Sequence, residues 1–270
     1  MSGFVRVSKY IGVVAAALLA AAIPAGAAPP ERVVSMNLCT DQMAMLLAAP
    51  GQLVSVSDLA SDPRMSPMAE EAGKYQPNYG RAEEIYLMQP DLVIAGQFTS
   101  GPSVAMLRRL GIRVEVLPPA EDFQAIRDEL ALVGEWLGRD EQAATLISQF
   151  DTRLATLSTA TARGRAALYY ANGFTSGPAT LAGAIIETAG YDNIAADYGI
   201  ETTTALPMEL LVMAEPDRLV TGAKWPGQSR SEAVLDHPAL VHAAPGLAEV
   251  TDRDWVCGTP YVLNAIEALQ

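Results

Sequence analysis

Two acidic side chains occupy the same place in a repeated segment. Residues 81–96, RAEEIYLMQPDLVIAG, predict a short amphipathic helix, a proline break and a buried strand, and residues 208–222, MELLVMAEPDRLVTG, repeat the pattern. A shift of 126 residues aligns Glu83 with Glu209. The duplication predicts two similar α/β lobes, each with one surface glutamate at the same helix position.

Side chains that would support hydrolysis or metal binding are scarce. The only histidines, His237 and His242, lie late in the chain, and neither is at the end of a predicted strand. A hydrolytic triad needs a histidine, and a zinc site needs clustered ligands. The sequence also lacks the phosphate-binding motifs GxGxxG and GxxxxGK[ST] and the nucleophile motif GxSxG. Enzymatic function is therefore the weaker class, and we predict no metal site.

Alternating predicted strands and helices are typical of an α/β fold with largely parallel sheets. The clearest helix spans 122–138, with Asp122 as its N-cap and Gly138 as its stop. The longest helical pattern, 140–161, lies between the two copies of the repeat and is a natural rigid connector. The pattern predicts an earlier helix that is capped by Thr40 or Asp41 and runs through Ala49, and it predicts long loops at 57–74 and 191–206.

The N-terminus predicts export. Arg6 and Lys9 precede an apolar run from Ile11 to Ile23, which is followed by a small-residue cleavage pattern ending at Ala27. The run is shorter than the roughly 20 residues that a membrane span requires. We therefore expect residues 1–27 to be a secretory signal peptide, and the exported protein to have no membrane insertion after cleavage.

The mature chain is strongly acidic. Without Arg6 and Lys9 it keeps 16 basic and 31 acidic residues, a net charge of −15. Such a charge argues against nucleic acid or an anionic membrane as partner. The chain has two cysteines, Cys39 and Cys257, which could form one disulfide in an oxidising compartment.

The carboxyl ends of the predicted strands locate a candidate ligand site. Ligands of parallel sheets bind beyond these ends. The corresponding segments are Asn37–Thr40, Gln97–Pro102, Asn172–Pro178 and Ala223–Trp225. With two lobes, we expect these loops to face each other across a cleft.

The order of motifs resembles the periplasmic substrate-binding proteins of ABC importers for vitamin B12, ferric siderophores and haem. The motifs are RVVSMN, the Glu83 helix before QPDLVIAG, the long central helix, YYANGFTSGPATLAGAIIETAGYDNI, the Glu209 helix before EPDRLV, and RDWVCGTP. The resemblance implies the class III architecture, in which one long helix joins two Rossmann-like lobes. The lobes would span 31–137 and 165–270, with the connecting helix at 138–162.

The resemblance also implies a function. The protein would be a periplasmic monomer that has no cofactor of its own, captures a metal chelate in the cleft and delivers it to the permease dimer of an ABC importer. Glu83 and Glu209 would dock on permease arginines, whereas the plain alternative is two solvated helix charges. The sequence does not identify the chelate, and the breadth of the family favours a siderophore or haem over a corrinoid.

Aromatic and polar loop residues are the candidates for lining the cleft, because chelates of this class are large and partly flat. The candidates are Asn37, Cys39, Tyr75, Tyr79, Gln97, Tyr170, Phe174, Trp225 and Trp255. For each aromatic the alternative is a packing role in the core or at the rim.

The resemblance places the turns that carry Cys39 and Cys257 at the cleft. Three states stay open: a disulfide, two half-buried free thiols, or a thiolate that binds the metal of the chelate. The alternative functions are an exported α/β enzyme and a zinc-binding relative of the importer proteins.

Overall fold

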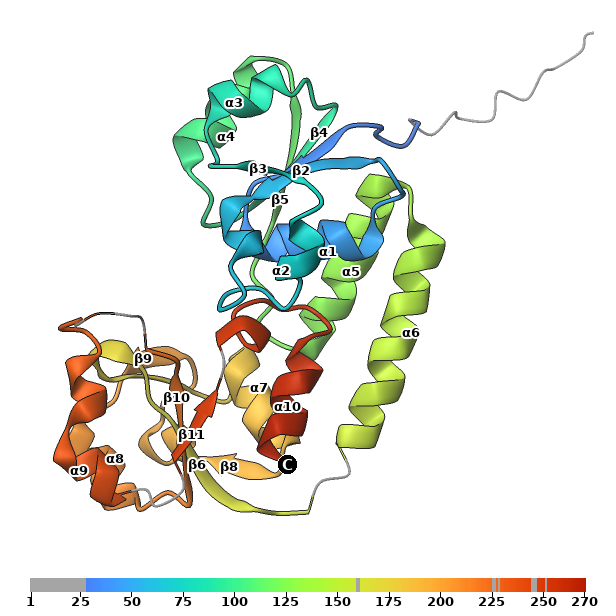
Figure 1. Cartoon of the computed structure of the whole chain (residues 1–270). Helices are drawn as coiled ribbons and strands as arrows, with labels where there is room; N and C mark the ends of the chain where they lie inside the picture. Colours follow the sequence, from blue (N-terminus) through green and yellow to red (C-terminus); the bar gives the residue numbers. More distant parts are fainter. Residues whose placement is uncertain (1–27, 159–160, 225–226, 228, 244–246, 251) are drawn as a thin grey trace, which may run out of the picture.

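Two β-sheets lie in separate lobes, and the helix α6 runs along one side of both (Figure 1). The computed structural model describes residues 28–158, 161–224, 227, 229–243, 247–250 and 252–270. The predicted signal peptide, residues 1–27, and the predicted cleft residue Trp225 lie outside the described residues.

The N-terminal lobe contains a five-stranded parallel sheet in the order β3-β2-β1-β4-β5. Its strands are β1 Val33–Ser35, β2 Leu53–Ser57, β3 Gln76–Asn78, β4 Leu92–Gly96 and β5 Arg113–Leu117. Its helices are α1 Leu38–Leu47, η1 Asp58–Ser61, α2 Ala69–Ala72, α3 Ala82–Leu87, α4 Gly101–Arg109 and α5 Phe123–Leu137. Every residue of β4 is buried, as a continuous apolar run in a parallel sheet predicts.

The C-terminal lobe contains a parallel sheet in the order β11-β10-β6-β8 and a separate antiparallel pair, β7-β9. Its strands are β6 Gly164–Leu168, β7 Phe174–Ser176, β8 Tyr191–Asn193, β9 Thr203–Ala205, β10 Arg218–Gly222 and β11 Leu247–Val250. Its helices are η2 Ala171–Gly173, α7 Leu181–Thr188, η3 Ile194–Tyr198, α8 Met208–Ala214, η4 Ala233–Asp236, α9 Pro238–Ala243, η5 Asp252–Asp254 and α10 Val262–Leu269.

Helix α6, Asp140–Leu157, packs against α5 of the first lobe and α10 of the second. Arg127 of α5 pairs with Asp151 at 2.6 Å, and its guanidinium lies 5.5 Å from the centroid of the buried Phe150 ring. On the other side, Arg153 donates to Asn264 and Glu267 of α10. The predicted connector, 138–162, thus contains a helix that is held by both lobes.

One hydrophobic core continues from the first lobe into the second. The same cluster of buried side chains includes Val33 of β1, Leu130 of α5, Phe150 of α6 and Ile266 of α10. Burial of apolar surface contributes roughly 25 cal/mol per Å². Separation of the lobes at this interface would expose part of that core to water.

Two local expectations, the start of the first helix and the two long loops, differ from the structure. The first helix starts at Leu38, because the Asn37 side-chain oxygen accepts the Cys39 N–H at 3.1 Å and provides the cap, three residues before Thr40 and four before Asp41. The expected loops 57–74 and 191–206 contain η1 and α2, and β8, η3 and β9, respectively. Tyr75–Tyr79 contains β3, where Pro77 is tolerated because β3 is an edge strand.

Candidate functional site

The chain's last segment lies against the carboxyl ends of the first lobe's strands. Cys257 is joined by a disulfide to Cys39, which follows β1, with the Cα atoms 5.1 Å apart. A Cβ on Gly258 would lie 2.2 Å from the Cβ of Ala120, which follows β5, so the close approach requires glycine. Loops that parallel-sheet topology places at one edge therefore meet the segment that follows β11.

A buried polar contact lies beside the disulfide. Thr259 Oγ1 donates to Gln42 Oε1 at 3.1 Å, and both residues are buried. Gln42 Nε2 has no hydrogen-bond partner within the described part of the chain. The contact adds to the disulfide in joining α1 to the C-terminal segment.

Asp254 and Trp255 bring unsatisfied polar atoms to the same segment. Asp254 Oδ1 and Trp255 Nε1 are buried and lack a hydrogen-bond partner among the residues that the structure describes. A buried donor or acceptor without a partner costs about 1–3 kcal/mol. Trp255 was predicted as a site residue, whereas sequence reasoning missed Asp254, which no pattern distinguishes from a surface aspartate. One acceptor and one donor are therefore unused within the described part of the chain.

Glu71 acts on Tyr75 and on Tyr261 of the C-terminal segment. Its hydroxyl donates to Glu71 Oε1 at 3.4 Å, and burial and the Glu71 charge raise the pKa of Tyr75. Burial raises the pKa of Tyr261 too, as do the charges of Asp254 and Glu71. The Glu71 charge therefore raises the pKa of a tyrosine from each lobe.

Asn37 and Gln97 come together at the ends of β1 and β4. A Cβ on Gly96 would lie 2.8 Å from the Asn37 carboxamide, so Asn37 packs directly over the end of β4. Gln97 follows and is exposed. Sequence reasoning did not select Phe98, whose side chain is 82% exposed. The one sequence feature that could have identified Phe98 as a site residue is its position directly after a predicted strand.

Tyr170 and Phe174 lie together in the second lobe. The Tyr170 N–H donates to the Phe174 carbonyl at 2.8 Å across the turn that contains η2. Tyr170 is half-buried against the main core, and Phe174 is exposed at the start of β7. The pair offers aromatic surface on the second lobe.

Tyr79 does not join the residues around the disulfide. Its side chain is 64% exposed and lines a hollow of about 570 Å³ with Arg32, Glu84 and Leu87, all from the first lobe. The hollow lies beside α3, because residue 79 follows the edge strand β3 and its backbone N–H donates to Glu84. Tyr79 remains a sequence prediction as a ligand contact.

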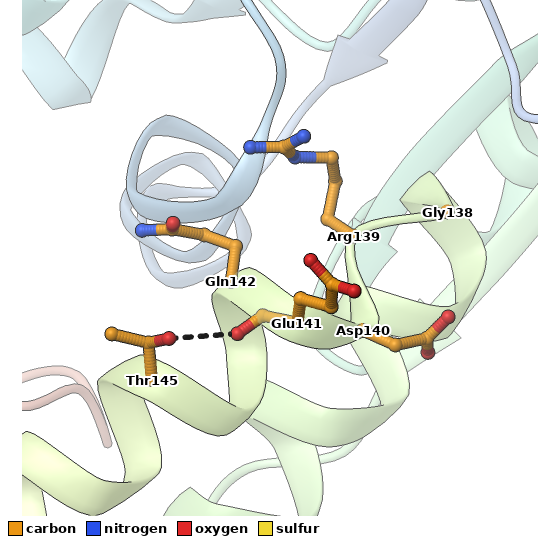
Figure 2. Close-up of a pocket in the computed structure, with 6 residues that line it drawn as sticks. All are labelled: Gly138, Arg139, Asp140, Glu141, Gln142 and Thr145. Atoms are coloured by element: carbon orange, nitrogen blue, oxygen red, sulfur yellow. Dashed lines mark hydrogen bonds between the residues drawn. The ribbon is translucent and has the colours of Figure 1, made fainter.

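Two further hollows lie away from the interlobe segment. One of about 370 Å³ lies on the second lobe between Lys224 and Asp236. The other, of about 450 Å³, is a polar hollow at the start of α6 (Figure 2). Figure 2 shows the Arg139 and Asp140 side chains pointing apart, and the Thr145 hydroxyl donating to the Glu141 carbonyl at 2.9 Å. None of the three hollows is lined by residues from both lobes.

Glu83 and Glu209 occupy matched positions. Each is exposed and is the second residue of its helix, α3 or α8. Within the described residues, neither carboxylate has a salt bridge or hydrogen bond. Figure 1 shows α3 and α8 at the outer parts of the two lobes, on the side away from α6.

The described residues offer no built metal site. No group of three or more His, Cys, Asp and Glu side chains among them could hold an ion. Both cysteines are in the disulfide, so the structure shows neither free thiols nor a thiolate ligand. His237 is exposed, and its Nδ1 accepts the Ala239 N–H at 3.2 Å. No helix in the described part of the chain has the length and apolarity to cross a bilayer.

Comparison with known proteins gives the family. Residues 33–244 match the periplasmic binding protein family. The chain belongs to this family. The resemblance that the sequence motifs indicated is confirmed, and the predicted α/β fold class is confirmed with it. Because the family is one of binding proteins, the enzyme alternative is set aside.

One similar curated protein is a cobalamin-binding protein of Halobacterium salinarum, 30% identical over 220 residues. The match covers 78% of this chain and 59% of the relative, so the chain spans about three fifths of that relative's length. Among solved structures, a periplasmic heme-binding protein of Pseudomonas aeruginosa has a TM-score of 0.71 at 23% identity, with 89% and 91% of the two chains covered. The periplasmic vitamin B12 binding protein of Vibrio cholerae has a TM-score of 0.63 at 20% identity, with 89% and 95% covered. These structures share the fold.

Proposed function

We propose that this periplasmic binding protein captures a corrinoid between its lobes and delivers it to the permease dimer of an ABC importer. The observation that carries the ligand site is the segment at Asp254 and Trp255, where an acceptor and a donor are buried without partners beside the interlobe disulfide. The lobes are 31–137 and 165–270, with the connector at 138–162. The protein works in the periplasm as a monomer after removal of its signal peptide.

The chemistry of the site favours a corrinoid over the other chelates of the family. A corrinoid carries amide side chains, which pair with carboxamides, carboxylates and N–H groups such as those of Asn37, Gln97, Asp254 and Trp255. Haem propionates and many ferric siderophores are anionic, and a mature chain with a net charge of −15 repels anions. The name of the Halobacterium relative supports the same choice. The sequence-based preference for a siderophore or haem over a corrinoid rests only on the breadth of the family, so the chemistry of the site outweighs it.

A binding assay with three chelates tests this function. The purified mature protein is dialysed separately against cyanocobalamin, hemin and ferrichrome, and the retained chelate is measured by its visible spectrum. We expect one equivalent of cyanocobalamin to be retained and the other two to be lost. Retention of hemin or ferrichrome instead would assign a different chelate, and retention of none would contradict the function.

Two variants locate the site. Trp255→Phe keeps an aromatic ring but removes the N–H donor, and Asp254→Asn keeps the shape but removes the charge. We expect each to weaken cyanocobalamin binding about 5- to 50-fold, the loss of one or two hydrogen bonds. Trp136→Phe, at a half-buried tryptophan on α5, is the matched control and should bind as the wild type does.

We also propose that Glu83 and Glu209 dock on cationic groups of the permease. Their exposure, their lack of partners among the described residues and their matched positions support this role.

A further inference from the structure

The two glutamate-bearing helices are anchored by equivalent hydrogen bonds. Asp91 Oδ1 accepts the Arg32 N–H at 2.9 Å at the start of β1. Asp217 Oδ2 accepts the Arg165 N–H at 2.8 Å in β6. The aspartates are 126 residues apart, the spacing that separates Glu83 from Glu209.

The same two arginines also hold the helix ends. The Arg32 guanidinium donates to the Met88 carbonyl at 2.8 Å, and the Arg165 guanidinium donates to the Ala214 carbonyl at 2.6 Å. Met88 and Ala214 are again 126 residues apart. The next residue in each lobe, Gln89 or Glu215, has a left-handed backbone with φ of 51° or 47°. Both helices therefore end in the same way and are held in matching positions on their lobes.

Each helix also carries an exposed apolar side chain at a matching position. Leu87 is 79% exposed and Met213 is 75% exposed. Each lies four residues after its glutamate, so the acidic and apolar side chains share one helix face. The opposite face, with Ile85 or Leu211, is buried in the core. Single exposed apolar residues are common and need no explanation. Here both copies of the repeat carry one at the same position, four residues after the glutamate.

We propose that Leu87 and Met213 add an apolar contact to each of the two glutamate docking sites, at equivalent places on a partner that has twofold symmetry. This inference rests on the proposed function and adds an apolar component to the docking of the permease dimer. A twofold partner fits because the same pair of side chains occurs once on each lobe. A cationic partner fits because the carboxylates lack partners in the described chain and the net charge of the mature chain is −15.

The spacing suits a long basic side chain. Positions i and i+4 on a helix lie about 6 Å apart. An arginine or lysine can pair with the carboxylate through its charged head and lay its methylene groups on the apolar residue. The acidic part of each site is weakened by salt, whereas the apolar part is not. The two parts can therefore be separated experimentally.

The test measures binding of the loaded protein to the corrinoid importer of the same organism, reconstituted in nanodiscs, at 50 and 300 mM salt. Leu87→Gln and Met213→Gln keep helix propensity and side-chain length but remove the apolar surface. We expect each to weaken binding about 3- to 10-fold and the double variant about 10- to 100-fold, by a factor that is similar at both salt concentrations. Glu83→Gln with Glu209→Gln should weaken binding mainly at 50 mM salt.

Controls separate this inference from the proposed function. Leu59→Gln, at an exposed leucine of η1, should leave importer binding unchanged. All variants should retain cyanocobalamin as the wild type does. Wild-type importer binding by the double Gln variant, or a loss confined to one lobe, would overturn the paired apolar sites while leaving ligand capture intact. Failure to retain cyanocobalamin by the wild type would overturn the proposed function itself.

Discussion

Thr259 of the C-terminal segment donates a buried hydrogen bond of 3.1 Å to Gln42 of the first lobe's α1. The bond lies beside the Cys39–Cys257 disulfide, which closes a sequence separation of 218 residues. The lobes are thus joined at this point as well as along α6. Relative movement of the lobes has to strain both connections.

Loss of the disulfide should destabilise the protein strongly. In the chain-entropy model a loop of this length contributes about 4–5 kcal/mol. We expect the double variant Cys39→Ser, Cys257→Ser to unfold at a clearly lower urea concentration than the oxidised wild type. The double variant should not respond to reductant. Two alkyl labels on the unreduced wild type, measured by intact mass, would contradict the bond.

The lobes should move little when ligand binds. The core is continuous across them, and α6 contains no proline or glycine between Asp140 and Leu157 at which it could hinge. Small-angle scattering of free and loaded protein should give nearly the same radius of gyration. A decrease of several ångströms on loading would show a hinge that the packing does not predict.

Stability should decrease as pH rises between about 4.5 and 8. Burial raises the pKa of Glu129 from 4.5 to about 8, and its Oε1 has no partner among the described residues. Burial also raises the pKa of Asp41 to about 6. Because both pKa values are higher in the folded state, the folded state binds more protons than the unfolded state in this window, and unfolding becomes easier as they are released.

A neutral isostere should remove most of that pH dependence. Glu129 is only 6% exposed, and Glu129→Gln should raise the free energy of unfolding by about 1–3 kcal/mol at pH 8 with little change at pH 4.5. Urea unfolding across this pH range measures the effect. Glu135→Gln, on the exposed face of the same helix, is the control and should keep the wild-type slope.

Replacement of both repeat glutamates should affect transport and not capture. Glu83→Ala with Glu209→Ala removes two exposed carboxylates from α3 and α8, which Figure 1 shows at the outer parts of the two lobes. We expect unchanged cyanocobalamin affinity and weaker uptake in proteoliposomes that contain the importer. Lost ligand binding together with normal uptake at saturating ligand would reverse this assignment.

Local signals predicted the parts of the fold that local interactions determine. Asp122 caps α5 by accepting the Ala125 N–H at 2.7 Å, and Gly138 ends that helix with φ of 66°. The duplicated segment was visible because each copy needs the same amphipathic helix, break and buried strand. These features depend on residues only a few positions apart.

The candidate site depended on contacts between distant residues, which the sequence pattern does not encode. Asp254 was missed because its burial depends on how the final segment packs, which neighbouring residues in the sequence do not show. Tyr79 was selected for its loop composition, but its side chain lies beside α3. Phe98 was overlooked because its exposure depends on the turn after β4. The resemblance to the family, rather than any periodicity in the sequence, predicted that Cys39 and Cys257 lie near each other.

The continuous core has a consequence for the order of folding. Val262, Leu263 and Ile266 of the last helix belong to the same buried cluster as Val33 of the first strand. The first lobe precedes these side chains by more than 100 residues in the chain, so part of its apolar surface has no cover until the last helix is in place. Folding can finish only when the last helix has packed on the first lobe, so a partly folded first lobe with exposed apolar surface should precede the native state.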